Sequence, residues 1–208
     1  MEDVLDVYMR PYDPKQPLVC MDEISKQLVG EVRQPLPPSP GQPERYDFEY
    51  VRNGVSNLFL FYEPLVGQRQ LHISDRRTRI DWAQCIKHLV DVQHPEAEKI
   101  TLVIDQLNTH SPASLYEAFT PEEAKRLADK LDIHHTPKHG SWLNIAEIEL
   151  SVLARQCLNQ RIPDETILRQ EVSAWEQRRN AKPGKVDWRF TTADARIKLQ
   201  HLYPSIEG

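Results

Sequence analysis

Cysteine is scarce in this chain, and its three copies are too far apart to form a recognisable motif. Cys20, Cys85 and Cys157 all stand outside any Cys-x-x-Cys pair. Cysteines with this number and spacing indicate neither a disulfide framework nor a zinc knuckle. We therefore expect three free, buried thiols.

Long apolar runs are also missing. No run approaches the roughly 20 residues that a membrane-spanning helix needs. The opening residues MEDVLDVYMR carry acids where a secretory signal peptide would carry basic residues. The composition, 39% hydrophobic and 27% charged, is typical of a globular protein rather than a disordered one. The sequence predicts a cytoplasmic domain with no membrane partner.

The chain has no excess of positive charge, which is unusual for a protein that binds nucleic acid. Its 31 acidic residues outnumber its 26 lysines and arginines, giving a net charge of -5. Domains that contact phosphates usually show the opposite balance. Two basic clusters nevertheless stand out, and they lie at residues 76–79 and 178–185.

The pattern of strands and helices predicts an α/β fold with a mixed sheet. A short strand is expected at 18–24, and a proline-rich exposed loop at 34–44. A meander should follow, in which the alternating stretch 45–53 leads through a turn at Asn53-Gly54 into strands at 57–65 and 70–75. Two further strands are expected at 100–104 and 132–137. Helices are expected at 80–92 behind a Thr78 cap, at 121–131, at 144–158 behind an Asn144 cap, at 164–181, and after Thr191 or Thr192. Because strands and helices alternate, helices should cover both faces of the sheet.

Carboxylates follow two of the apolar strands. Asp22 and Glu23 follow Met21, and Asp105 follows Ile104. Ionised carboxylates at the end of a buried strand need exposure, hydrogen bonds or a cation, and each Asp by itself could simply cap a loop. If the two strands are neighbours, Asp22 and Asp105 lie side by side, and Mg²⁺ or Mn²⁺ would resolve their repulsion.

Polar residues continue directly from Asp105. Gln106, Asn108, Thr109 and His110 follow it without a glycine or proline. We expect their side chains to hold the carboxylate and its loop in a fixed geometry.

A third acid is expected from the helix that follows Asn144. Glu147 and Glu149 are two positions apart and cannot face the same site. Glu149 falls among apolar residues, whereas Glu147 lies at the edge of the apolar face, which favours Glu147 as a metal ligand. Spacing alone leaves both open.

These segments carry a resemblance to a known family. MDE at 21–23, DQLNTH at 105–110 and HGSWLNIAE at 139–147 together resemble the three motifs of DDE transposases of the mariner superfamily, and most closely those of its bacterial insertion-sequence, or six-thirty, branch. The resemblance extends from about Val19 over nearly the whole chain. Gln106 stands where the family commonly has Asn.

The resemblance implies a ribonuclease-H-like, retroviral-integrase-like fold with a mixed five-stranded sheet. Asp22, Asp105 and Glu147 would be the catalytic triad that holds two Mg²⁺ ions, or Mn²⁺ in their place. Supporting roles would fall to Glu23, Gln106, Asn108, His110 and Asn144. The function implied is DNA strand cleavage and strand transfer at the element ends and target. Candidate DNA contacts are Lys138, His139, Arg76, Arg77 and Arg79.

The family normally carries a helix-turn-helix region before the catalytic domain, and only residues 1–17 precede the first strand here. We expect an N-terminal extension at 1–17, a catalytic domain at 18–203 and a tail at 204–208. A separate DNA-binding polypeptide and a homodimer in the active complex are the expected partners. The alternative function is a truncated, non-catalytic fragment that binds DNA or transposase.

Other chemistries fit the sequence less well. His134, His135 and His139 are candidate zinc ligands, but His134 and His135 are adjacent on a predicted strand, so they point to opposite faces and cannot bind the same ion. Ser141 beside His139 lacks the Gly-x-Ser-x-Gly turn of a hydrolase nucleophile. A phosphatase would need a second Asp two positions after Asp22, where Ile24 stands.

Overall fold

A five-stranded mixed sheet forms the centre of the computed structural model, which describes residues 1–43, 45, 47–138 and 140–203. The strands are β1 (Leu18–Glu31), β2 (Tyr50–Glu63), β3 (Gln68–Ser74), β4 (Ile100–Ile104) and β5 (Leu131–His135). They lie in the order β3-β2-β1-β4-β5. Strand β1 pairs antiparallel with β2 and parallel with β4, so the meander and the parallel half of the sheet meet at β1.

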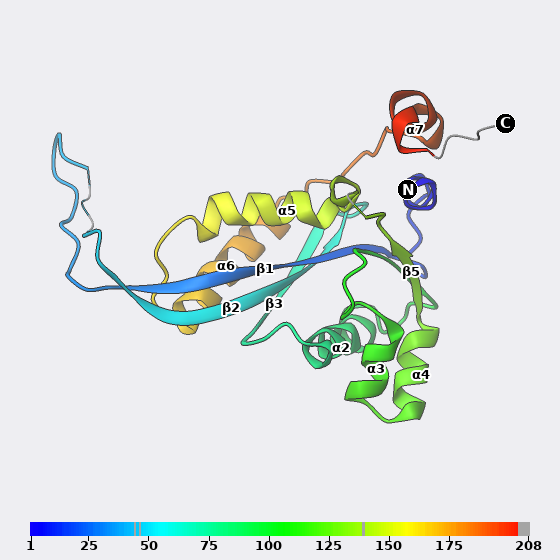
Figure 1. Cartoon of the computed structure of the whole chain (residues 1–208), viewed down its shortest axis with the longest axis horizontal. Coiled ribbons are helices and arrows are strands. Elements are labelled where there is room, and N and C mark those ends of the chain that lie inside the picture. The colour runs from blue at the N-terminus through cyan, green and yellow to red at the C-terminus, as the bar shows by residue number, and fades with distance from the viewer. Residues whose placement is uncertain (44, 46, 139, 204–208) are drawn as a thin grey trace.

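Helices cover both faces of this sheet (Figure 1). One face packs against α5 (Ile145–Leu153) and α6 (Glu165–Asn180), and the other against α2 (Arg79–His88), α3 (Pro112–Ala118) and α4 (Pro121–Asp129). Single π-helical turns extend α2 through Leu89–Gln93 and α5 through Ala154–Leu158. The predicted α/β class with two covered faces is confirmed.

The two apolar cores follow from the alternation of side chains along β1. Cys20 packs into the core on the α5 side, whereas Val19 and Met21 pack into the core on the α2 side. Asp22 and Glu23 continue this alternation and therefore point to opposite faces. The three cysteines are free and buried, as predicted.

The predicted helix starts agree with the structure. Thr78 caps α2 and accepts a hydrogen bond from the backbone of Asp81, whose carboxylate accepts one in return from the Thr78 backbone. Asn144 caps α5, and Thr191 caps α7 (Thr192–Lys198). Hydroxyl and amide side chains at these positions satisfy the free N–H groups of a first helical turn.

The predicted turn at Asn53-Gly54 is wrong. Both residues lie inside β2, opposite the break in register between Gln27 and Val29 of β1, so they form a β-bulge. Gly54 has φ of 102°, which a bulge accommodates as readily as a turn does. The chain instead reverses between Glu31 and Tyr50, and the proline-rich stretch lies in this long loop.

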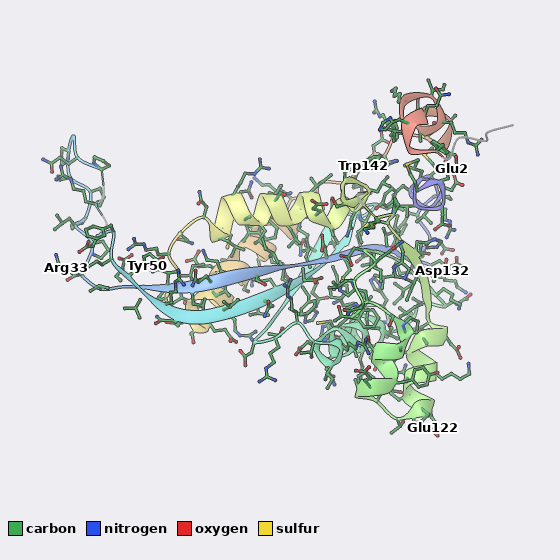
Figure 2. All side chains as sticks on the ribbon, in the orientation of Figure 1. Glu2, Arg33, Tyr50, Glu122, Asp132 and Trp142 are labelled. Carbon is green, nitrogen blue, oxygen red and sulfur yellow. The ribbon has the colours of Figure 1, made fainter. Side chains whose placement is uncertain are left out.

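Strand β1 is also longer than predicted, because its outer half pairs with β2 alone. The two strands stay paired as far as Glu31 and Tyr50, and they form an arm that projects from the body (Figure 1). Figure 2 shows Arg33 and Tyr50 at this arm, far from Trp142 in the 3-10 turn before α5 (Ser141–Leu143). The acids at 22 and 23 therefore stand within β1 rather than at its end.

Two short helices lie together at the end of the sheet opposite the arm. α1 (Glu2–Tyr8) lies beside α7, and Val4, Leu5, Val7 and Tyr8 are buried in the core on the α5 side. The Tyr8 hydroxyl donates to the backbone oxygen of Leu143. The segment predicted as an N-terminal extension thus packs on the fold, while the domain boundary at residue 18 stays a prediction.

The outer edge of β3 is covered by polar side chains of α6. Asn180 accepts a hydrogen bond from the backbone N–H of Arg69 and donates to its carbonyl oxygen, at 3.0 and 2.8 Å. Glu176 accepts from Leu71 N–H, and Arg169 donates to the Ile73 carbonyl. The helix therefore supplies the partners that a sixth strand would supply.

No helix in the described part of the chain is long and apolar enough to cross a bilayer.

Candidate active site

Asp22 and Asp105 come together because β1 and β4 are parallel neighbours. The pairing of the two strands runs from Leu18 with Thr101 to Cys20 with Val103, and the two aspartates stand two residues beyond the last pair. β4 ends at Ile104, whereas β1 continues. Beyond this point the β4 side of β1 is open, so both carboxylates reach space that no strand fills.

Glu147 joins them from α5, and Asn144 fixes the position of this helix. The Asn144 side chain donates to the carbonyl of Met21 at 2.9 Å and accepts from the N–H of Ala146. One side chain thus joins the start of α5 to the residue immediately before Asp22. Glu147, in the first turn, is thereby held on the side of the helix that faces β1.

The three acids line one cavity of about 370 Å³ between β1 and α5. Its other lining residues are Glu23, Ile24, Ser141, Asn144, Leu150, Ser151 and Ala154. No Lys or Arg stands among these residues. The cavity therefore places three carboxylates from three distant segments against a partly apolar wall.

Glu149 points away from this cavity and is buried between two arginines. Its carboxylate lies 2.5 Å from the Nε of Arg69 and 2.9 Å from Arg179. The side chains of Arg69 and Glu149 are only 1% and 7% exposed. This ion pair joins α5 to β3 and α6, and it leaves Glu147 as the acid of α5 that faces the cavity.

His110 connects Asp105 to Glu23 on the opposite face of β1. Its Nδ1–H donates to Asp105 at 2.6 Å, and its Nε2 lies 3.2 Å from a carboxylate oxygen of Glu23. The ring is 1% exposed and lies 5.9 Å from the ring of Trp82. Although burial opposes the charge, the contacts with Asp105 and Glu23 raise the pKa of His110 to about 9. A protonated His110 thus lies between two carboxylates and holds the loop after β4.

The pKa values of the two aspartates move in opposite directions. Burial, reinforced by the charges of Glu23, Asp105 and Glu147, raises the pKa of Asp22 to about 7. Burial also acts on Asp105, but the hydrogen bonds from His110 and from the backbone of Leu107 outweigh it and lower its pKa. The site therefore holds more negative charge than its own residues balance.

Divalent cations suit this set of donors. Carboxylate oxygens are the ligands that Mg²⁺ and Mn²⁺ prefer, and Glu147 Oε2 is buried with no hydrogen-bond partner among the described residues. Within the described ranges, no three acidic, histidine or cysteine side chains stand close enough together to hold an ion as they lie. Asp22, Asp105 and Glu147 supply oxygen donors of the kind that such ions take, and they line one cavity.

The other residues predicted for the site are only partly brought together. Glu23, His110 and Asn144 make the contacts described above. Gln106 and Asn108 are exposed, and neither makes a hydrogen bond to a described residue, so the expected support of Asp105 comes from His110 and from the Leu107 backbone. A short loop that exposes its tip leaves these two side chains in solvent.

The predicted DNA contacts lie in different places. Lys138 lines a second cavity of about 370 Å³, which adjoins Asp105 and Ser141. Arg76 and Arg79 line a separate cavity, and Arg79 forms an ion pair with Glu117. Arg77 is exposed in the same loop, and His139 lies outside the described residues.

Ser141 is the site residue that sequence reasoning missed. The sequence suggests it only as a possible nucleophile, yet it lines both cavities beside Asp105. Its place in the HGSWLNIAE motif was the available signal.

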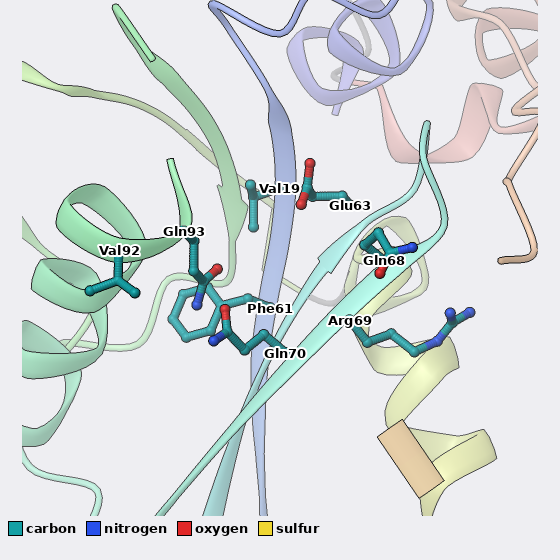
Figure 3. A pocket seen from close by; sticks show the side chains of 8 residues that line it. All are labelled: Val19, Phe61, Glu63, Gln68, Arg69, Gln70, Val92 and Gln93. Carbon is teal, nitrogen blue, oxygen red and sulfur yellow. The ribbon is translucent and has the colours of Figure 1, made fainter. Parts of the chain in front are cut away.

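A further cavity of about 290 Å³ lies on the other face of the sheet, between β1, β2, β3 and the turn after α2 (Figure 3). Val19, Phe61, Glu63, Gln70 and Gln93 are among its lining residues, and none of the three acids is. Burial raises the pKa of Glu63 to about 7, and the carboxylate lies 3.6 Å from His94.

Solved structures of Mos1 transposase share this fold. The Mos1 mariner paired-end complex with Mn aligns with a TM-score of 0.56 at 16% identity, over 85% of this chain and 52% of that chain. The Mos1 strand transfer complex aligns with a TM-score of 0.56 at 14% identity, over 87% of this chain and 55% of that one. The chain thus spans about half the length of these relatives. No curated protein matches it in sequence.

A family match covers most of the chain and includes all three acids. Residues 17–169 match the family described as DDE superfamily endonuclease. The ribonuclease-H-like architecture predicted from the motifs is the one found in the Mos1 catalytic domain. This chain belongs to the DDE superfamily endonucleases.

Proposed function

We propose that this chain is the catalytic domain of a transposase, which cleaves DNA strands at the ends of an element and joins them to target DNA. The observation that carries the proposal is the single cavity shared by Asp22, Asp105 and Glu147. The Mos1 relatives support it, because their structures are a paired-end complex with Mn and a strand transfer complex. Assignment to the bacterial six-thirty branch stays a prediction.

In this proposal, Asp22, Asp105 and Glu147 hold two divalent cations, with Mg²⁺ as the natural ion and Mn²⁺ as a substitute. Bound there, the ions would lower the pKa of an attacking water or 3′-hydroxyl and neutralise charge on the departing oxygen. Asn144 orients α5, and with it Glu147, over β1. His110 orients Asp105 through its hydrogen bond, and its positive charge partly offsets the negative charge of Glu23.

The proposed partner is DNA, with a second copy of the chain in the active complex. The net charge of -5 indicates that much of the affinity for DNA comes from elsewhere, since phosphate contacts require Lys and Arg. A separate DNA-binding polypeptide or a further segment of the protein would supply it.

Glu147→Gln tests the proposal. Gln keeps the shape of the side chain but removes the charge that an ion requires, so Mn²⁺-dependent nicking of supercoiled plasmid should fall by at least about 100-fold. In a chelator the melting temperature should not fall below that of wild type, because Glu147 has no ion-pair partner among the described residues and its charge repels that of Asp22.

Glu122→Gln is the matched control, because Glu122 is exposed on α4 (Figure 2). It should nick at the wild-type rate. Equal nicking by wild type and Glu147→Gln would overturn the enzymatic proposal, and it would favour a non-catalytic fragment that binds DNA or transposase.

A further inference from the structure

We propose that the second cavity beside Asp105 is a phosphate subsite, in which Lys138 binds the DNA phosphate next to the one that is cleaved. This inference rests on the proposed function and assigns part of its substrate path. The cavity is lined by Asp105, Gln106, Leu107, Thr136, Pro137, Lys138 and Ser141.

The two cavities adjoin at Asp105 and Ser141, which belong to the linings of both. The first cavity extends along Ile24, Leu150 and Ala154, which are apolar, and the second leads to the hydroxyl of Thr136 and the ammonium of Lys138. A nucleotide chain with its scissile phosphate at Asp105 would therefore extend into both, and its next phosphate on the second side would lie at Lys138.

Lys138 is the sole Lys or Arg among the residues that line these two cavities. It is exposed and forms no ion pair with a described residue. The basic residues on the opposite face behave differently, since Lys87 and Arg126 are both engaged by Asp91 and Glu123. A cation left unpaired in the cavity that adjoins Asp105 is available to a polyanion, which the acids alone would repel.

The backbone that carries Lys138 is fixed. The N–H of Thr136 donates to the Ile104 carbonyl at 2.9 Å, and the N–H of Gly140 donates to the Pro137 carbonyl at 2.8 Å. The first bond ties the segment to the end of β4, directly before Asp105, and the second lies within the segment. The side chain thus starts from a defined place while its ammonium remains free to move onto a phosphate.

The first test measures binding of a fluorescein-labelled DNA duplex as a function of salt, with Ca²⁺ in place of Mg²⁺. Loss of one phosphate contact lowers the slope of log K against log salt by about 0.9, so Lys138→Ala should show this decrease. Lys185→Ala is the matched control. It removes the same charge from an exposed loop between α6 and α7, and its slope should equal that of wild type.

The second test locates the phosphate. On an oligonucleotide that wild type nicks, neutral methylphosphonates are placed one at a time around the mapped cleavage site. At the phosphate next to the cleavage site, the neutral linkage should reduce the kcat/KM of wild type by roughly tenfold. Lys138→Ala should cause the same loss on unmodified DNA, and the neutral linkage should not lower the kcat/KM of this variant further.

The outcomes separate the subsite from the proposed function. If Glu147→Gln abolishes nicking but Lys138→Ala matches wild type in slope and rate, the subsite is wrong and the function stands. If the methylphosphonate and Lys138→Ala effects multiply at every position, the subsite is also wrong. If wild type does not nick at all, the proposed function fails and the salt slopes alone decide the subsite, with equal slopes for wild type and Lys138→Ala rejecting it.

Discussion

At the scale of single residues, two glutamates two positions apart on α5 have entirely different surroundings. Glu147 faces a cavity lined with other acids, and Glu149 is held between Arg69 and Arg179. Removing one partner of a buried ion pair leaves an uncompensated charge, whereas an acid among other acids gains nothing from its neighbours. The two glutamates lie on different sides of α5, and this difference alone separates a candidate functional acid from a structural one.

Glu63 gives the fold a pH dependence that is independent of the acidic cavity. Its pKa is raised from 4.5 to about 7 by burial, so the folded state holds its proton more tightly than the unfolded state does. This contribution to stability is present below about pH 4.5 and is lost as pH rises through about 7, by an amount on the order of 3 kcal/mol. The measurement is thermal unfolding of wild type and Glu63→Gln across this range.

The difference in stability between wild type and Glu63→Gln reports the contribution of Glu63. The same range also contains His72 and His94, whose pKa values are lowered by burial and which act in the opposite direction. Wild type should lose stability relative to Glu63→Gln as pH rises. A difference that does not change with pH would show that Glu63 titrates normally.

At the scale of elements, the backbone N–H and C=O groups on the outer edge of the sheet find their hydrogen-bond partners on a helix. Three polar side chains of α6 hydrogen-bond the outward backbone groups of β3, and Asn180 serves both groups of Arg69. An unpaired backbone group that is shielded from water is costly. The contact also keeps this edge from pairing with another chain.

Asn180→Ala should therefore destabilise the domain by about 1–3 kcal/mol, because it leaves a backbone donor and acceptor of β3 unpaired. The change should appear in the free energy of unfolding from urea titration. Gln177→Ala serves as the control, since Gln177 lies on the exposed side of α6 and should change stability by no more than about 0.5 kcal/mol. Equal effects of the two substitutions would contradict the edge-capping role.

At the scale of the whole molecule, the fold gathers like charges at this site and neutralises them only in part, through His110. The acids come from β1, from the loop after β4 and from α5. The packing of both cores holds these segments together despite the repulsion between the acids. Sites of this kind commonly reduce stability in return for function. Ion binding should therefore stabilise the entire domain.

Divalent ions should raise the melting temperature of wild type, by an amount that corresponds to about 1.4 kcal/mol when the ion is at ten times its Kd. Asp22→Asn removes one of the repelling charges, so it should melt higher than wild type in a chelator and should lose most of the response to Mn²⁺. Asp129→Asn, at an exposed position of α4, should keep the full response. An unchanged Mn²⁺ response in Asp22→Asn would place the ions elsewhere.

Motifs and helix caps were readable from the sequence because they depend on neighbours in the chain. The capping residues Thr78, Asn144 and Thr191 and the strand at 100–104 agree with the structure for this reason. Asn53-Gly54 misled the prediction, because a glycine with positive φ suits a bulge and a turn equally well, and only the pairing of β2 with β1 distinguishes them.

The sequence by itself determined which segments carry the acids, that an α/β sheet would order them, and that their motifs are those of the DDE superfamily. Only the tertiary structure decided that β1 and β4 are parallel neighbours, that Asn144 ties α5 to Met21, and that two arginines bind Glu149 and leave Glu147 free. The physical reason is that side-chain chemistry and helix capping are local properties. The repulsion among Asp22, Asp105 and Glu147 exists only after segments far apart in the chain have packed on one sheet.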